Sequence, residues 1–479
     1  MNRRSRLLVS VACLLCVSGW IVAALLAWKQ AATPTQFAQV PSAPGIAESG
    51  IAAHFREWSS HPQLAGSLVG FCVLDEDGET LFASPLAETA LCPASTLKIV
   101  ATGAALGVLG PEFRFETTLL ATAPLDDQGR LVGDMILVGG GDPTLTQEDL
   151  AQLADAAVAA GLKSVSGVVR VDTSLFPVDP MSEHWNWGDV GNGYGAGAFG
   201  LNLDHNRLAL RFEPGAQPGE PARFLGDVQV AVGTRWENHV VTGPAGSGDN
   251  VVIYSEPYGR VITMRGTVPV DADVFSVSAA NPDPPAVAVE LLRARLENAG
   301  VQFENVLGPF PSAEETVLAR HHSAPLEEII QHTHAASDNL EAQCLFLMVG
   351  LRRGAPPERA VSDYWTEAGV QFVGLRLIDG SGLARANMIR PLDLASVAHA
   401  ARRRPHGQVF FESLSSYVQG HARGKIGGMS GVKTQVGYLH HESGRQLTYA
   451  VMGNGLAPGR EFWSRLEELL AAVRVTPPK

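Results

Sequence analysis

The sequence predicts a mixed α/β (α+β) fold in which both ends of the chain form one core and a β-rich middle is inserted into it. Three observations support this prediction. Helical patterns lie toward both chain ends, short alternating strands fill residues 117–281, and the chain holds 50 Gly and 30 Pro. So many turn-forming residues favour mixed structure over a bundle of long helices.

The composition is that of a globular protein that does not bind nucleic acid. The 479 residues are 46% hydrophobic and 18% charged, and the formal net charge is -13. Nucleic-acid phosphates require a basic surface, so we expect no nucleic-acid partner. A chain of this length also allows more than one domain, since domains usually have ~100–200 residues.

The first 44 residues predict a membrane-targeting segment followed by a linker. Three Arg among the first six residues precede Leu7–Trp28, which carries no charge. A run of ~20 apolar residues can span a bilayer, whereas a cleaved signal peptide usually has an apolar core of ~7–15 residues. An uncleaved anchor is favoured over a cleaved signal, and both remain open. Either one predicts an exported, periplasmic or extracytoplasmic body and limits membrane contact to this segment.

Three elements are predicted in the first part of the core, residues 45–116. Two strands flank Asp77-Gly78, a dipeptide that favours a tight hairpin turn. The apolar helix that follows begins near Ser95 and ends before Pro111, which cannot continue it. The predicted ranges are a helix at 46–58, a hairpin at 66–83 and a helix at 93–110.

Residues 117–281 predict an inserted β-rich region, and residues 282–479 return to the core. Short runs of alternating residues are bounded by Gly, Pro, Asp and Asn, which is typical of strands and turns. The insertion has strands within 134–140, 167–176, 206–214, 227–233, 250–256 and 260–268 and a helix at 147–161. The returning core has helices at 284–299, 324–334, 337–351, 392–403 and 459–473 and strands at 426–432, 435–440 and 447–453.

The cysteines outside the apolar run are Cys72, Cys92 and Cys344. An exported protein can form disulfides, and Cys72–Cys92 is the pair to consider. Small buried thiols are an equally good interpretation. No Cys or His cluster in the body has the spacing of metal ligands, so we expect no metal.

Ser95 and Lys98 form a Ser-x-x-Lys motif at the start of the helix predicted at 93–110. Residues i and i+3 share one helical face, which brings the lysine beside the hydroxyl. A serine hydroxyl is a poor nucleophile and needs an adjacent base, which a deprotonated lysine supplies. The alternative is an N-cap serine and a surface lysine, and a second Ser-x-x-Lys at Ser430–Lys433 shows that the motif alone is weak.

Ser337 and Asn339 form a Ser-x-Asn motif at a predicted helix boundary. In an active site the hydroxyl would relay a proton to a leaving amine, and the amide would hold a substrate carbonyl. The structural alternative is helix capping by Ser337 and Asp338. A third element, Lys-x-Gly on a strand, has two candidates, Lys425 and Lys433. Its lysine would supply positive charge, and its glycine would let a substrate backbone pair beside the strand.

Ser-x-x-Lys, Ser-x-Asn and Lys-Thr-Gly, in this order, resemble the signature of penicillin-binding proteins and serine β-lactamases. The large insertion after the first motif is similar to that of low-molecular-mass class C penicillin-binding proteins, the penicillin-binding protein 4 type D-alanyl-D-alanine carboxypeptidase/endopeptidases (peptidase family S13). The resemblance covers about residue 66 to the C-terminus. It rests also on "PASTLK" (93–98), "LVGGGDPTL" (137–145), "VDTSLF" (171–176), "HSAPLEEII" (322–330), "SDNLEA" (337–342) and "DGSGLARAN" (379–387).

This resemblance implies a penicillin-recognising, serine transpeptidase-like domain. Its antiparallel sheet is flanked by helices, and two small domains are nested in the insertion. The implied reaction is attack of the active serine on the bond between two D-alanines of a peptidoglycan stem peptide. Water then hydrolyses the acyl-enzyme, and β-lactams acylate the same serine. No cofactor or metal is implied.

The resemblance also implies residue roles. Ser95 would be the nucleophile and Lys98 its base, with Ser337, Asn339 and Lys425 completing the site. The backbone N–H groups of Ser95 and Gly428 would form the oxyanion hole. Asp172, in "VDTSLF", resembles a residue that reaches toward the amino end of the stem peptide, with an Asx-turn at a strand end as the alternative.

The spacing of the third motif selects Lys425. The family pattern is approximately Lys-Thr-Gly-Thr-Leu-x-Gly-Val, four residues, then Gly-Tyr. From Lys433 the Gly-Tyr pair comes eight residues too early. From Lys425 the pattern matches without a gap at Gly427, Gly431, Val432, Gly437 and Tyr438.

This register places Ile426 where the family has Thr or Ser. The missing hydroxyl would bind the terminal carboxylate of the substrate, and one charged hydrogen bond is worth roughly 1.5–3 kcal/mol. Gln343 also replaces the usual Glu, and the segment between Leu414 and Lys425 is shorter than in the family. These departures predict weakened carboxypeptidase binding with the catalytic groups retained.

The function predicted on this basis is an exported serine D-alanyl-D-alanine carboxypeptidase/endopeptidase that acts on peptidoglycan peptides and is acylated by β-lactams. One alternative is an envelope binding or scaffold relative with weak or lost peptidase activity. Another is a β-lactamase or esterase, although the sequence offers no assignable deacylating Glu.

Overall fold

The computed structural model describes residues 50–176, 179–226, 228–310, 314–459 and 461–477. The predicted targeting segment and linker lie outside this part of the chain. Within it, no helix has both the length and the apolar composition needed to cross a bilayer.

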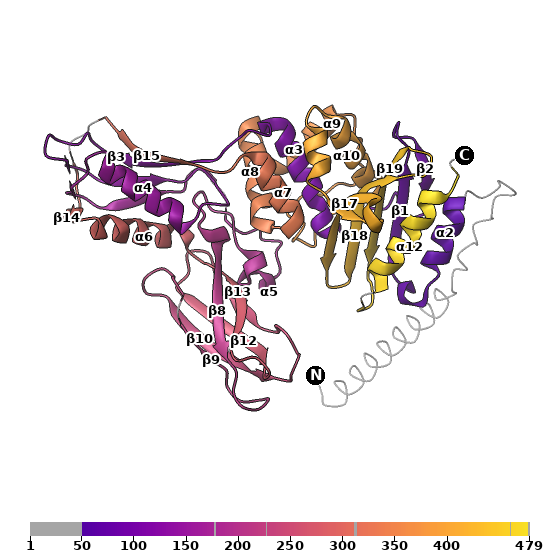
Figure 1. Cartoon of the computed structure of the whole chain (residues 1–479), viewed down its shortest axis with the longest axis horizontal. Coiled ribbons are helices and arrows are strands. Elements are labelled where there is room, and N and C mark those ends of the chain that lie inside the picture. Colours follow the sequence, from indigo (N-terminus) through magenta and orange to yellow (C-terminus); the bar gives the residue numbers. More distant parts are fainter. Residues whose placement is uncertain (1–49, 177–178, 227, 311–313, 460, 478–479) are drawn as a thin grey trace, which may run out of the picture. The chain divides into compact units, whose positions relative to one another are not determined.

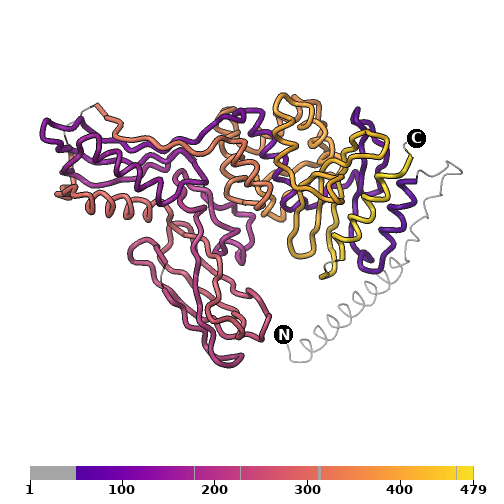
Figure 2. The backbone as a smooth tube through the Cα atoms, in the orientation of Figure 1, coloured from indigo at the N-terminus to yellow at the C-terminus, as the bar shows by residue number. Residues whose placement is uncertain are grey.

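The first and last described strands of the chain lie side by side in one six-stranded antiparallel sheet. Strand β1 (Leu68–Leu74) pairs with β19 (Gln446–Asn454), and Figure 2 shows this indigo N-terminal strand among the yellow C-terminal ones. Strand β2 (Thr80–Ala83) completes the predicted hairpin, with Gly78 at φ 90° in its turn. The remaining strands are β16 (Ser415–Tyr417), β17 (Ala422–Met429) and β18 (Val432–His440), in the order β16-β17-β18-β19-β1-β2.

Helices cover both faces of this sheet (Figure 1). The helices of the core are α2 (Gly50–Ser59), α3 (Lys98–Leu109), α7 (Leu326–Ala336), α8 (Asn339–Arg353), α9 (Pro357–Glu367), α10 (Pro391–Arg403), α11 (Gly407–Glu412) and α12 (Glu461–Val475). Helices α10 and α12 pack directly on strands of the sheet, whereas α8 and α9 pack against α3. On one face, Phe55 of α2 and Leu466 of α12 pack with Phe71 of β1. On the other face, Leu394 of α10 is buried with Met452 of β19. Helix α3 packs against α8 in the same cluster, so the start of α3 lies next to the start of the Ser337–Asn339 segment.

The inserted region contains two further apolar cores. The first combines the sheet β15-β3-β5-β7, the small sheet β14-β6-β4 and two helices around Leu137, Leu153 and Leu292. Its elements are β3 (Glu116–Ala121), β4 (Arg130–Leu131), β5 (Met135–Val138), α4 (Gln147–Ala159), β6 (Ser164–Val165), β7 (Val169–Asp172), α6 (Pro284–Asn298), β14 (Gln302–Phe303) and β15 (Thr316–His322).

The second core of the insertion lies between two three-stranded sheets, β13-β8-β9 and β10-β12-β11, and includes Phe212 and Ile253. The strands are β8 (Arg207–Glu213), β9 (Arg223–Phe224), β10 (Arg235–Gly243), β11 (Val252–Tyr254), β12 (Val261–Pro269) and β13 (Phe275–Ala280). A short helix, α5 (Trp187–Val190), and a 3-10 turn at Gly193–Gly195 precede β8.

Two elements that follow residue 281 bear on where the chain returns from the insertion to the core. Strand β15 pairs with β3, and α6 packs on α4, so both belong to the inserted sheet. The helical pattern at 284–299 had suggested a core element because sequence periodicity does not show what a helix packs against. We propose that the inserted region comprises about residues 116–322 and has two subdomains.

Several predicted boundaries differ from the structure. Residues 228–233 form no strand, and the neighbouring Arg235–Gly243 forms β10 in their place. The strand predicted at 426–432 ends at Met429, because Gly431 adopts φ 74° in the turn to β18. Helices α9 and α11 were not predicted from the sequence.

The three described cysteines are free and buried. Cys72 and Cys92 therefore form no disulfide, and the interpretation as small buried thiols is the one that the structure shows. Burial raises the pKa of Cys72 to about 12, which keeps this thiol protonated.

Candidate active site

Ser95 lies in the 3-10 turn Ala94–Leu97 that leads directly into α3. Ala94, the residue before it, has φ 47°, a left-handed conformation that costs a non-glycine residue free energy. The backbone of Gly382 packs closely against this turn. A Cβ at Gly382 would lie 1.9 Å from the Ala94 carbonyl oxygen, so a side chain at this position would clash. The turn leaves Ser95 only partly buried, at the surface of the cleft.

Lys98 is fully buried one turn below Ser95. Its Nζ contacts Ser95 Oγ at 3.0 Å, Asn339 Oδ1 at 2.6 Å and the carbonyl oxygen of Ser381 at 2.8 Å. Burial, reinforced by the charge of Lys425, lowers the pKa of Lys98 to about 7. A large fraction of Lys98 is therefore neutral near pH 7, within reach of the Ser95 proton.

Ser337 joins α7 to α8 in a left-handed conformation, with φ 57°. Asp338 caps α8, because its Oδ1 accepts a hydrogen bond from the backbone N–H of Glu341 at 3.0 Å. This turn directs Asn339 to Lys98 through its Oδ1 and to the carbonyl oxygen of Tyr194 through its Nδ2, at 2.7 Å. Ser337 is the C-cap residue of α7, and of the two residues predicted to cap α8 only Asp338 does so.

Lys425 extends from β17 to the Ser337–Asn339 turn. Its Nζ donates to Ser337 Oγ at 2.8 Å and to the carbonyl oxygen of Ile426 at 2.9 Å. Burial lowers its pKa to about 8. Lys433 lies on β18, where its Nζ donates to the Gly459 carbonyl oxygen and lies 5.9 Å from the centroid of the Phe462 ring. The structure thus brings Lys425, and not Lys433, to the Ser95–Ser337 cleft.

The outer edge of β17 is open beside Ser95. Strand β16 pairs with only Ala422–Gly424 of β17, so the described strands leave Lys425–Met429 unpaired on that side. A Cβ at Gly427 would lie 2.8 Å from the Ser95 backbone nitrogen, so only glycine fits this approach. Gly428 follows at the wall of the cleft. An extended peptide could add to this edge as a further strand.

Ile426 lies on the opposite face of β17 from Lys425, and its side chain is 37% exposed. Ile426 is not among the residues that line the hollow, whereas Gly428, Met429 and Ser430 are. Ile426 therefore removes a hydroxyl without filling the cleft.

The cleft is a hollow of about 390 Å³ between the core and the insertion. The insertion contributes Asp189 and Tyr194, and the Asp189 Oδ1 accepts a hydrogen bond from the Tyr194 hydroxyl at 2.9 Å. Arg385 lies opposite, with its Nη1 donating to the Ser430 carbonyl oxygen at 3.0 Å. The lining residues are Ser95, Asp189, Tyr194, Ser337, Asn339, Gly382, Leu383, Arg385, Gly428, Met429 and Ser430.

Asp172 is not among these lining residues. It ends β7 and accepts a hydrogen bond from the backbone N–H of Ser174 at 2.9 Å, which is the geometry of an Asx-turn. The carboxylate that the insertion presents to the cleft belongs to Asp189. Sequence reasoning missed Asp189 and Tyr194 because they follow an irregular segment without periodicity, and it missed the Ser381 carbonyl contact because a carbonyl leaves no sequence signal.

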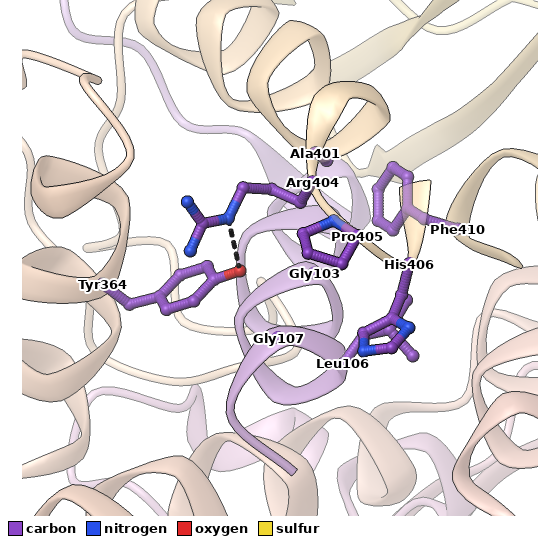
Figure 3. Close-up of a pocket in the computed structure, with 9 residues that line it drawn as sticks. All are labelled: Gly103, Leu106, Gly107, Tyr364, Ala401, Arg404, Pro405, His406 and Phe410. Carbon is purple, nitrogen blue, oxygen red and sulfur yellow. Dashed lines mark hydrogen bonds between the residues drawn. The ribbon is translucent and has the colours of Figure 1, made fainter. Parts of the chain in front are cut away.

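A second hollow lies at the other end of α3 and contains none of the motif residues (Figure 3). It is lined by Gly103, Leu106, Gly107, Tyr364, Ala401, Arg404, Pro405, His406 and Phe410. Arg404 Nε donates to the Tyr364 hydroxyl at 3.3 Å across it. Its volume of about 80 Å³ is too small for a peptide, so it offers no alternative site for the chemistry.

One group of described residues has the composition of a metal site. The ligand atoms of His205, Asp338 and Glu341 lie within 4.8 Å of one another. However, the Arg207 guanidinium already binds Asp338 Oδ2 at 2.7 Å, and this positive charge would repel a divalent cation. We assign no metal to this cluster.

Comparison with known proteins places this geometry in a family context. Residues 51–472 match the model of the D-Ala-D-Ala carboxypeptidase 3 (S13) family. The D-alanyl-D-alanine carboxypeptidase of Actinomadura sp. strain R39 is 31% identical over 433 residues, which cover 82% of this chain and 79% of that protein. The D-alanyl-D-alanine carboxypeptidase DacB of Haemophilus influenzae is 27% identical over 427 residues, covering 82% of this chain and 87% of that protein.

Solved structures show the same fold. The crystal structure of penicillin-binding protein 4 (DacB) from Haemophilus influenzae superposes with a TM-score of 0.76 at 22% sequence identity. The superposition covers 87% of this chain and 98% of that chain. A structure of the same protein in complex with a β-lactam superposes with a TM-score of 0.71.

Proposed function

Because this chain belongs to the D-Ala-D-Ala carboxypeptidase 3 (S13) family, we propose that it is a serine-type D-alanyl-D-alanine carboxypeptidase/endopeptidase acting on peptidoglycan stem peptides. The relatives that carry the D-alanyl-D-alanine carboxypeptidase name are matched over most of their length. The cleft contains a serine hydroxyl, a buried lysine and an open strand edge, which support the proposed nucleophile, base and peptide-binding edge of such an acyl transfer.

The observation that carries this proposal is that two buried lysines each contact a serine hydroxyl of the cleft. Lys98 Nζ joins Ser95 Oγ to Asn339, and Lys425 Nζ joins the β17 strand to Ser337 Oγ. These contacts support Lys98 as the group that acts on the proposed nucleophile and Lys425 as the group that acts on the hydroxyl proposed to face the leaving group. A structural pair of lysines would not be held in contact with two separate serine hydroxyls.

In the acylation step, neutral Lys98 takes the proton of Ser95 as Oγ attacks the carbonyl carbon between the two D-alanines. The developing oxyanion lies toward the backbone N–H groups of Ser95 and Gly428, which need no reorganisation to donate. Ser337, polarised by Lys425, relays the proton that Lys98 has taken to the leaving nitrogen as the C–N bond breaks, so Lys98 becomes neutral again. Water then attacks the acyl-enzyme with Lys98 again as the base.

The same geometry supports a binding position for each end of the substrate peptide. The ammonium of Lys425 and the open edge of β17 suit the terminal D-alanine and its carboxylate, with the Ile426 substitution removing one hydroxyl contact. The Asp189 carboxylate suits an amino group on the stem peptide farther from the scissile bond. Asp189 lines the cleft, so we assign it the role that sequence resemblance had suggested for Asp172.

The proposal includes an extracytoplasmic location, because peptidoglycan lies outside the cytoplasm and the first 44 residues have the pattern of a targeting segment. β-Lactams are the expected inhibitors, and membrane contact through that N-terminal segment is part of the same proposal. The balance between carboxypeptidase and endopeptidase activity depends on the size of the leaving group that the Lys425 side of the cleft admits.

Release of D-alanine from a synthetic stem pentapeptide tests the proposed reaction. The wild-type protein should release D-alanine, and Ser95→Ala should release none while retaining its melting temperature. Hydrolysis of a β-lactam without release of D-alanine would identify a β-lactamase instead. Binding of the pentapeptide without turnover would identify a scaffold relative.

A further inference from the structure

Behind the Ser337–Asn339 turn lies a group of charged side chains that the proposed reaction does not use. Arg207 opens β8 of the insertion, and His205 precedes it by two residues. They face Asp338 and Glu341 of the core, whose side chains are 0% and 1% exposed. Two buried carboxylates this close together repel each other unless positive groups compensate them.

Arg207 holds two segments at once. Its Nη2 donates to Asp338 Oδ2 at 2.7 Å, and its Nε donates to the carbonyl oxygen of Gly193 at 3.1 Å. The neighbouring carbonyl, that of Tyr194, accepts the hydrogen bond from Asn339 Nδ2 at 2.7 Å. The Arg207 guanidinium therefore links the Gly193–Tyr194 segment of the insertion to the Ser337–Asn339 turn, and the Asn339 side chain lies between these two segments.

His205 faces the same carboxylates from the side. Its Nδ1 lies 3.5 Å from Asp338 Oδ2 and 3.8 Å from Glu341 Oε1, distances of an ion pair without a short hydrogen bond. The His332 ring of α7 lies 5.5 Å from the His205 ring, and its Nδ1 is 2.6 Å from Glu341 Oε1. The charged or titratable groups around His205 are thus Asp338, Glu341, His332 and Arg207, with Asp204 beside it in the chain.

Backbone strain marks both sides of this contact. Asp204, His205 and Asn206 have φ values of 49°, 54° and 53°, and Ser337 across from them has φ 57°. Left-handed conformations of residues other than glycine are unfavourable and persist where surrounding contacts over-determine them. On the insertion side, Asn206 Nδ2 supplies such contacts by donating to the Gly197 carbonyl oxygen at 2.8 Å.

We propose that Arg207 and the protonated form of His205, both from the insertion, are positioning residues that hold Asp338 and thereby fix Ser337 and Asn339 in their catalytic orientation. Neither residue touches the reacting atoms. The inference rests on the proposed function of the cleft, and it assigns the insertion a part in acylation as well as in substrate binding. Without these cations the turn would relax, and Asn339 would lose its place between Lys98 and Tyr194.

The charge of His205 makes the positioning of Asp338 depend on pH. The Asp338 carboxylate raises the pKa of His205, against the opposing effect of burial. Protonated His205 adds to the hold on Asp338 at acid pH, and the addition is lost as the pH rises through this pKa. Arg207 keeps its charge throughout, so the hold is reduced and not abolished at alkaline pH.

Stopped-flow acylation of Ser95 by a fluorescent penicillin tests the proposal in the intact protein. Arg207→Ala should slow acylation roughly 100-fold, the cost typical of a misplaced catalytic group, while Arg207→Lys should restore part of the rate. In an Asp338→Asn background, Arg207→Ala should cause little further loss, because Arg207 acts through Asp338. D-alanine release should show the loss in kcat more than in KM.

The matched control is Arg295→Ala, which removes the Arg295–Asp155 ion pair elsewhere in the insertion and should leave acylation unchanged. If Arg207→Ala does not fold, Arg207→Gln retains a donor for Gly193 and takes its place. A folded variant that is acylated at the wild-type rate, or equal losses in both Asp338 backgrounds, would overturn the proposal. Failure of wild type itself to react would instead reject the proposed function.

The proposed role of His205 is tested by the pH dependence of acylation. The ratio of acylation rates, wild type over His205→Asn, should be largest at acid pH and should decline as the pH rises. A ratio that does not vary with pH would show that the charge of His205 has no part in positioning the turn.

Discussion

At the residue scale, we propose different tasks for Lys98 and Lys425, because they contact different hydroxyls. Lys98 touches Ser95 and must be neutral to accept a proton, whereas Lys425 touches Ser337 and must keep its charge. Burial lowers both pKa values, to about 7 for Lys98 and about 8 for Lys425. The required state, neutral Lys98 with protonated Lys425, is therefore most populated between these two values.

This arrangement predicts a bell-shaped dependence of acylation on pH. The rate constant should rise as Lys98 loses its proton near about pH 7 and fall as Lys425 loses its proton above about pH 8. Stopped-flow measurement with a fluorescent penicillin gives this profile. The control is Lys425→Arg, which cannot lose its charge and should abolish the alkaline decline. A rate that falls with rising pH below about pH 7 would contradict Lys98 as the base.

Ile426 gives a second prediction at the same scale. Ile426→Thr returns a hydroxyl to an exposed position on β17, the strand whose open edge is proposed to bind the terminal D-alanine. A charged hydrogen bond of about 1.4–2.8 kcal/mol corresponds to a gain of roughly 10- to 100-fold in kcat/KM. The gain should appear in D-alanine release and be smaller for Ile426→Val, the control without a hydroxyl. Equal values for both variants would contradict this account.

The sequence motifs identified five residues that the structure brings into one cleft: Ser95, Lys98, Ser337, Asn339 and Lys425. Their roles remain predictions. The motifs carry this information because a nucleophile and its base have fixed spacing on a helix. Asp189 could not be found in this way, because it reaches the cleft through the tertiary placement of an irregular segment.

At the scale of elements, the close approach of β17 to the Ser95 turn would determine the geometry of the proposed oxyanion hole. Hairpins and long helices were predictable because the turn at Asp77-Gly78 and the helical periods are local signals. Strand β10 was not predictable in the same way, because its partner β12 lies in parallel register and its own alternation is interrupted by charged residues. Whether such a segment forms a strand depends on its pairing with residues that are distant in the sequence.

Gly427→Ala tests this close approach. The added Cβ would lie 2.8 Å from the Ser95 nitrogen and 2.7 Å from the Thr96 nitrogen, so β17 or the Ser95 turn must move. We expect a loss of about 1–3 kcal/mol in unfolding free energy and roughly a 100-fold slower acylation. At Gly428 the nearest atom to a new Cβ is 4.0 Å away, so Gly428→Ala should keep its melting temperature. Equal stability of the two variants would exclude the proposed contact.

At the scale of the whole molecule, the insertion supplies one wall of the cleft. The alternating pattern of residues 117–281 predicted an inserted, β-rich region, and its bounds remain a prediction. The sequence could not show that α6 and β15 also pack in this region, because that depends on pairing between segments nearly 200 residues apart. The sequence likewise could not show the position of the Asp172 side chain. Its motif suggested a contact with the substrate, whereas the side chain accepts a hydrogen bond within a local turn.

Asp189→Asn tests the contribution of the insertion to substrate binding. Loss of the carboxylate should raise KM for a stem peptide with a free amino group roughly 10- to 100-fold, the value of a charge-assisted contact. Acylation by a small penicillin that does not reach this wall should change little. Asp172→Asn is the matched control and should leave both reactions near wild type. An effect of Asp172→Asn alone would return the amino-end role to Asp172.

The central claim is that Ser95, activated by Lys98, forms the acyl-enzyme. The most direct measurement is covalent labelling by a fluorescent penicillin, with the labelled residue located by mass spectrometry of the digested protein. The account predicts one label on the peptide that contains Ser95 in wild type, none in Ser95→Ala, and labelling retained in Lys433→Gln. Absence of label in the folded wild-type protein, or label on another serine, would contradict it.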